Sequence, residues 1–82
     1  MNELEWSLHA KDVVHERRIG EQWVIRTIDH PDHSEVREDG CTHYVSSIPE
    51  FGGRVLRVVV NRNVTPSRIV TAFFDRRLGK KL

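Results

Sequence analysis

Two valine- and aromatic-rich stretches near the C-terminal end constrain the fold of this chain more than any other feature. Arg54 to Asn61 carries four valines and a leucine, and Arg68 to Arg76 combines β-branched with aromatic residues. Both compositions are typical of β-strands. The residues between them include Pro66 and predict a turn. Because a connection this short joins antiparallel neighbours, these stretches predict a hairpin.

The N-terminal third predicts two short helices. Ser7 is a suitable N-cap, and the apolar spacing that follows predicts a helix from Leu8 to Arg18. A second helix is predicted from Glu21 to Asp29, where apolar residues share one face. Pro31 ends it, since proline cannot continue a helix and restricts the residue before it.

Further strands are expected between the helices and the hairpin. Cys41 to Ile48 is a strand candidate, and Ser34 to Arg37 is a short edge strand that precedes the turn signal Glu38-Asp39-Gly40. We therefore predict an α+β fold in one domain, residues 1–82, with both helices packed on one face of a three- or four-stranded antiparallel meander.

Strand alternation assigns side chains to the two faces of this sheet. The more uniformly apolar set is expected to face the helices, and it comprises Leu56, Val58, Val60, Val70, Ala72 and Phe74. The other face is expected to be open, and it comprises Val55, Arg57, Val59, Thr71, Phe73 and Asp75. A cationic, partly aromatic sheet face suits RNA, whose bases stack on aromatic rings. An ordinary two-sided strand with one arginine reaching water explains the same pattern.

The charge of the chain is divided between its two parts. Residues 1–50 hold five basic and eleven acidic residues, a formal charge of −6, whereas residues 51–82 hold eight basic residues against Asp75, a charge of +7. A basic segment points to a polyanionic partner, although the acidic helices could also neutralise the basic strands within one molecule. With a lone Cys41 and neither a long apolar run nor a leader-type N-terminus, we expect a cytoplasmic protein without membrane contact.

Cleavage of RNA through its 2′-hydroxyl needs a base, an acid and cations that stabilise the phosphorane. His9 is the candidate base or acid, because histidine titrates near neutral pH, and Asp75 could orient a histidine or pair with an arginine. The predicted catalytic residues are His9, Arg17, Arg57, Asp75 and Arg76, and the predicted nucleic-acid-binding residues are Arg54, Arg57, Arg76, Arg77, Lys80 and Lys81. A packing or capping role for His9 and a solvated strand end at Arg76 and Arg77 are the simpler alternatives.

The histidines and the aspartate around Pro31 are residue types that bind metals, but their pattern around a proline indicates a turn. His30, Asp32 and His33 flank this proline, and no second paired ligand set accompanies them. No metal site and no cofactor are therefore expected.

Four short motifs, in order, carry a family resemblance: Leu8-His9-Ala10 with Glu16-Arg17-Arg18-Ile19, Trp23-Val24 with His30-Pro31-Asp32, residues 53–60, and residues 69–77. Together they resemble the small bacterial family of domains of unknown function numbered 4258. That family is similar, more distantly, to the RelE/ParE-like toxins, which pack two helices against an antiparallel sheet.

The resemblance implies a metal-independent endoribonuclease or RNA-binding toxin that acts on RNA or the ribosome. It also implies an antitoxin encoded by an adjacent gene. Many members carry an arginine where this chain has Val13, which weakens a catalytic role for the first helix, while Arg17 is retained one turn later. The alternative is a non-catalytic module that binds a partner protein through a sheet face or an edge strand.

Overall fold

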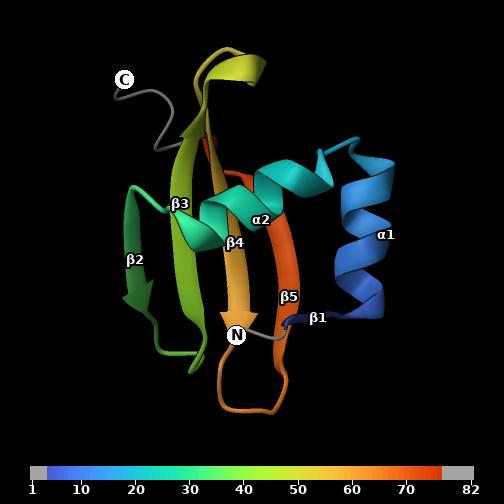
Figure 1. Ribbon diagram of the computed structural model, residues 1–82, viewed down its shortest axis with the longest axis vertical. Helices are drawn as coiled ribbons and strands as arrows, with labels where there is room; N and C mark the ends of the chain where they lie inside the picture. The colour runs from blue at the N-terminus through green and yellow to red at the C-terminus, as the bar shows by residue number, and fades with distance from the viewer. Residues whose placement is uncertain (1–3, 77–82) are drawn as a thin grey trace.

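The computed structural model describes residues 4–76 as a sheet with helices on one face (Figure 1). In chain order the elements are β1 (Leu4–Trp6), α1 (Leu8–Glu16), α2 (Glu21–Asp29), β2 (His33–Val36), β3 (Thr42–Ile48), a 3₁₀ turn η1 (Pro49–Phe51), β4 (Arg54–Asn61) and β5 (Ser67–Phe74). Within this described range, no helix is long and apolar enough to cross a membrane.

The sheet has five strands in the order β1-β5-β4-β3-β2, and it is mixed. Strands β2 to β5 form the predicted antiparallel meander, but β1 adds a parallel strand beside β5, with Leu4 opposite Ser67 and Trp6 opposite Ile69. The prediction of three or four antiparallel strands was therefore wrong. A three-residue strand shows too little alternation to be recognised, and its pairing partner lies more than 60 residues away.

Both helices begin as predicted, and α1 ends earlier than Arg18. The Ser7 hydroxyl accepts from Ala10 N–H at 3.0 Å and donates to Val70 O at 3.1 Å, so it caps α1 and fastens it to β5. At the other end, Ile19 N–H donates to Val14 O at 2.9 Å and Arg18 adopts a left-handed φ of 55°. This is the hydrogen-bond pattern of a Schellman motif, which closes α1 and buries Ile19 against Val14.

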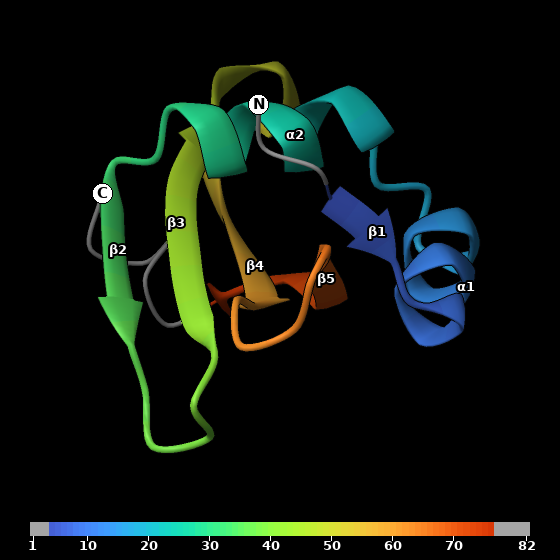
Figure 2. The ribbon, with the colours of Figure 1, turned by 60° about the horizontal axis from the view of Figure 1, so that its bottom comes forward.

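One core cluster lies between the helices and the sheet (Figure 2). α2 lies across β3 and β4, and α1 lies against β5 beside β1. The cluster comprises Ala10, Val14, Ile19, Val24, Ile28, Ile48, Leu56, Val58, Val60, Ile69 and Ala72. The packing of both helices against one face therefore follows the prediction.

A register shift in the β4–β5 hairpin corrects the predicted alternation of β5. Val59 pairs with Thr71 but Val60 pairs with Ile69, so Val70 is an extra residue between them. Such a bulge reverses which side chains point inward. Ile69 is fully buried in the core in place of Val70, which sequence alternation had assigned there, while Ala72 keeps its predicted side.

The sheet face opposite the helices is less open than predicted. Val45, Val55 and Val59 belong to that face by alternation, yet each is at most 7% exposed. These three valines at the centre of the face are therefore buried. The face does not expose the broad aromatic and cationic surface that strand alternation predicts.

Candidate nucleic-acid interface

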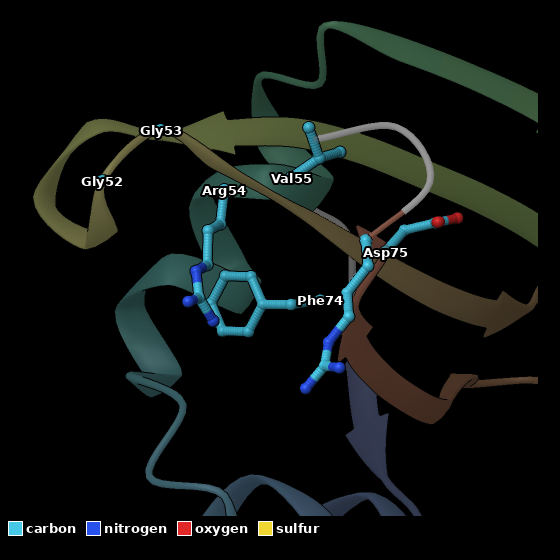
Figure 3. A pocket seen from close by; sticks show the side chains of 7 residues that line it. Gly52, Gly53, Arg54, Val55, Phe74 and Asp75 are labelled. Atoms are coloured by element: carbon cyan, nitrogen blue, oxygen red, sulfur yellow. The ribbon is translucent and has the colours of Figure 1, made fainter. Parts of the chain in front are cut away.

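An open pocket of about 490 Å³ lies where β4 begins and β5 ends (Figure 3). These two strand ends meet because β4 and β5 are antiparallel neighbours. The lining residues are Gly52, Gly53, Arg54, Val55, Phe74, Asp75 and Arg76. Arg54 thus meets Asp75 and Arg76, two other predicted site residues, although about 20 positions separate it from them in the chain.

Two glycines shape the turn that leads into the pocket. Gly52 and Gly53 have φ values of 68° and 74°, in the left-handed region that residues with a side chain rarely adopt. A Cβ at Gly52 would meet nothing within 4 Å, so backbone conformation rather than space requires glycine there. Gly53 N–H donates to Ile48 O at 2.9 Å. This hydrogen bond closes the turn, so that β4 begins at the next residue, Arg54.

Three aromatic rings from separate elements form one wall beside the pocket. Phe51 and Phe74 have ring centroids 4.8 Å apart, and Trp23 of α2 lies 5.8 Å and 6.3 Å from them. The Arg54 guanidinium lies 5.0 Å from the Phe51 centroid, a cation–π distance. In Figure 3 the Phe74 ring reaches toward Arg54, whereas the Asp75 carboxylate points away from both. Phe51 remains 41% exposed, so an apolar surface adjoins the cation.

Behind the pocket, a chain of four polar side chains crosses β3, β4 and β5. Arg57 Nε donates to Asp75 Oδ2 at 3.1 Å, and Arg57 also contacts His43 Nδ1 at 3.2 Å. His43 Nε2 lies 3.0 Å from Asp39 Oδ2. Arginine can only donate, so His43 Nδ1 accepts, and a neutral His43 carries its proton on Nε2 and donates it to Asp39.

The pKa values of Asp39 and of the neighbouring Cys41 are shifted from their ordinary values. Two hydrogen bonds, first from Cys41 N–H and then from His43, lower the pKa of Asp39 below its ordinary value. Cys41 itself is a free thiol whose pKa is raised, first by burial and then by the negative charge of Asp39. Because its pKa is raised, Cys41 stays protonated as a thiol, which is a weaker nucleophile than a thiolate.

The arginines of the predicted site fall into two environments. The Arg57 side chain is 11% exposed, and the Asp75 side chain, with which it forms an ion pair, is 8% exposed. Because Arg57 is nearly buried and already paired, it is poorly placed to bind a phosphate. Arg54 and Arg76 are exposed, and neither forms an ion pair within residues 4–76. Among the described residues that line the pocket, Arg54 and Arg76 are therefore the cations that can meet a ligand.

Other predicted residues lie elsewhere. His9 is exposed in the first turn of α1, and Figure 1 shows that α1 begins at the end of the molecule opposite η1. Arg17 is exposed where α1 ends, and no side-chain hydrogen bond of either residue occurs in the described part of the chain. The structure does not join them to the pocket. Arg77, Lys80 and Lys81 lie outside the described residues.

Within residues 4–76, one ion pair joins the acidic N-terminal part of the chain to its basic C-terminal part, as the charge division predicts. Arg68 of β5 pairs with Glu5 of β1 at 3.3 Å on the surface. Among the described residues, no group of three or more histidine, cysteine, aspartate or glutamate side chains could hold a metal ion.

The sequence did not predict that His43 or the aromatic wall of Trp23, Phe51 and Phe74 belongs to this site. Each of these residues sits in a different element, and only the three-dimensional pairing brings them together. Phe51 directly precedes the double glycine, and a bulky apolar residue at an exposed turn was the one available signal.

The fold and the pocket define a small α+β domain with an exposed cationic and aromatic site at one end of its sheet. The profile of a family described as Domain of unknown function (DUF4258) matches residues 6–74, and the chain belongs to that family. Neither the curated proteins nor the solved structures provide a significant match to this chain.

Proposed function

We propose that this chain is an RNA-binding domain of the RelE/ParE-like toxin type and that it engages RNA through the Arg54–Arg76 pocket. The observation that carries the proposal is the convergence of two exposed guanidinium groups with exposed aromatic surface. Two helices on one side of a largely antiparallel sheet are the architecture that the toxin resemblance implies. This role is cytoplasmic, and it implies an antitoxin as the second partner.

Each part of the pocket has a chemical task in this proposal. Arg54 and Arg76 offer planar, permanently charged donors that suit phosphate oxygens. The exposed part of Phe51 offers a surface for a base, and such stacking contributes about 1–3 kcal/mol per base. Stacking on a ring needs no particular base and favours single-stranded RNA, whose bases are free to leave a duplex.

The geometry supports binding more directly than cleavage. Arg54 and Arg76 could stabilise the charge of a phosphorane, but His9 lies in the first turn of α1, which begins at the end of the molecule opposite η1 (Figure 1). His43 contacts the pocket only through Arg57 and Asp75, and Arg57 occupies its Nδ1. Endoribonuclease activity through His9, Arg17 and Arg57 is the catalytic form of the proposal. It requires RNA cleavage that is lost in His9→Ala.

The test is a binding titration of a fluorescent single-stranded RNA at several salt concentrations. We expect Arg54→Ala with Arg76→Ala to weaken binding on the order of 10- to 100-fold. The slope of log K against log salt should fall by about 1.4, because two charges contribute about 0.7 each on a single strand. Arg68→Ala is the matched control, since Arg68 is exposed but pairs with Glu5.

Two results would overturn the proposal. One is the absence of RNA binding at low salt by the unmodified protein. The other is equal weakening by Arg68→Ala and by the pocket double variant, which would mean that net charge alone determines binding. In either case the non-catalytic protein-interaction module becomes the better account of the domain.

A further inference from the structure

β2 is an edge strand whose outer side pairs with no strand among the described residues. It is the last strand in the order β1-β5-β4-β3-β2, and all four of its residues are exposed. Val36 is 72% exposed, an unusual state for a valine in a strand. Natural edge strands are usually protected from pairing by short length, charged side chains, proline or a bulge. β2 is short and carries Glu35, but it contains neither lysine nor proline, and its register with β3 is regular from His33 to Val36.

The hairpin geometry fixes which backbone groups of β2 face outward. Arg37 N–H donates to Cys41 O at 3.0 Å and Gly40 N–H donates to Arg37 O at 2.9 Å, with Gly40 at φ 79°. This three-residue loop makes Arg37 and Cys41 a hydrogen-bonded pair. Hydrogen-bonded and non-bonded pairs alternate along an antiparallel ladder, so Glu35 is bonded to β3. The N–H and C=O groups of Ser34 and Val36 therefore point to the free edge.

We propose that β2 pairs antiparallel with β2 of a second copy of this chain, with Val36 opposite Val36 of the partner subunit on a two-fold axis. This register continues the sheet across both copies and uses the outward backbone groups of Val36 in reciprocal hydrogen bonds. It also covers the most exposed strand valine. The inference is independent of RNA binding, because the pocket lies at the start of β4 and the end of β5.

The charges of Glu35 and Arg37 favour this register over the neighbouring register that keeps the same hydrogen-bond pattern. With Val36 on the axis, Glu35 faces Arg37 of the partner subunit, and the symmetry repeats this favourable pair. A shift that preserves the hydrogen-bond phase places Glu35 opposite Glu35 of the partner subunit, where like charges repel. Within one chain, Glu35 and Arg37 already lie 3.1 Å apart, so the dimer would hold four alternating charges.

The dimer is expected to be weak and dependent on protein concentration. Two strands of four residues bury less than the roughly 1,200 Å² of stable specific interfaces. Exposed charge pairs are also screened by salt. High salt should therefore shift the equilibrium toward monomer.

Disulfide trapping tests the register. In a Cys41→Ser background, Val36→Cys should form a covalent dimer on mild oxidation, because opposed residues of a hydrogen-bonded pair have Cα atoms about 5.5 Å apart. Ser34→Cys is the matched control. In this register Ser34 faces Glu38 of the partner subunit and lies too far from Ser34 of the partner subunit for a disulfide. Equal trapping of both variants, or trapping of neither, would overturn the proposal.

A charge exchange tests the contact in solution without oxidation. By sedimentation at high protein concentration, Glu35→Arg and Arg37→Glu should each weaken the dimer about tenfold, whereas the double variant should recover it. A double variant as monomeric as the single ones contradicts the register. A monomeric unmodified protein whose β2 edge is instead covered by a strand of another protein also contradicts self-pairing.

Discussion

Arg57 Nε donates to Asp75 Oδ2 at 3.1 Å across the last two strands, and both side chains are nearly buried. Asp75 N–H also donates to Val55 O at 2.8 Å, so both the backbone and the side chain of this residue are fixed at the end of β5. Phe74 and Arg76, on either side of it, line the pocket. The ion pair therefore supports the strand end that presents the exposed cation.

Removing Arg57 should destabilise the fold. We expect Arg57→Ala to lower the free energy of unfolding by about 1.5–3 kcal/mol, because the nearly buried Asp75 carboxylate loses one charged hydrogen-bond donor. Urea denaturation measures this. Arg68→Ala breaks an exposed pair with Glu5, 51% exposed on each side, and should cost at most about 1 kcal/mol. Equal losses in the two variants would show that the Arg57–Asp75 pair is not structural.

Replacing Arg18 with glycine should stabilise the protein. Arg18 closes α1 at a φ of 55°, and this left-handed conformation costs residues other than glycine about 1 kcal/mol. We expect Arg18→Gly to raise the free energy of unfolding by about 0.5–1 kcal/mol. Arg17→Gly is the control, because Arg17 has a φ of −90° and gains nothing from glycine. A loss of stability in Arg18→Gly would contradict the assigned helix end.

Glu50 should make stability depend on pH in the acid range. A two-bond ion pair with Arg26, at 2.8 and 2.9 Å, and then a backbone hydrogen bond lower the pKa of Glu50 from 4.5 to about 2. Because the folded pKa is the lower one, the pair stabilises the fold above pH 4.5, and this contribution is lost as the pH falls toward about 2.

Comparison of the unmodified protein with Glu50→Gln measures this contribution. The difference in their free energies of unfolding should be constant near neutral pH and should shrink across the acid range. In Arg26→Gln, NMR titration should show the pKa of Glu50 returning toward its ordinary value. An unchanged pKa of Glu50 in that variant would mean that Arg26 is not the main cause of the shift.

Local signals in the sequence predicted the helices and the central hairpin. Ser7 caps α1 by a contact three residues away, and the valines of β4 mark a strand whose bounds, Arg54–Asn61, match the structure. Elements that depend on distant pairing were not predictable. β1 is a strand only because β5 offers it an edge, and the bulge at Val70 depends on the partner strand rather than on its own sequence.

The site was predictable in part for the same reason. An antiparallel hairpin necessarily brings Arg54 near Asp75 and Arg76, so the arginines of the pocket followed from the strand assignment. His9 was chosen for its chemistry alone, and it lies in the first turn of α1, which begins at the end of the molecule opposite η1 (Figure 1). The contacts of His43 with Arg57 and Asp39 were not predictable, because no sequence spacing reveals them.

The most direct test of the account is NMR mapping of the backbone amides during titration with a short single-stranded RNA. We expect the shifted amides to cluster at Gly52, Gly53, Arg54, Asp75 and Arg76, with little change in the first turn of α1. In the double variant, Arg54→Ala with Arg76→Ala, the shifts of the remaining amides should need roughly 10- to 100-fold more RNA. Shifts centred on His9 and α1, or no shifts at low salt, would contradict it.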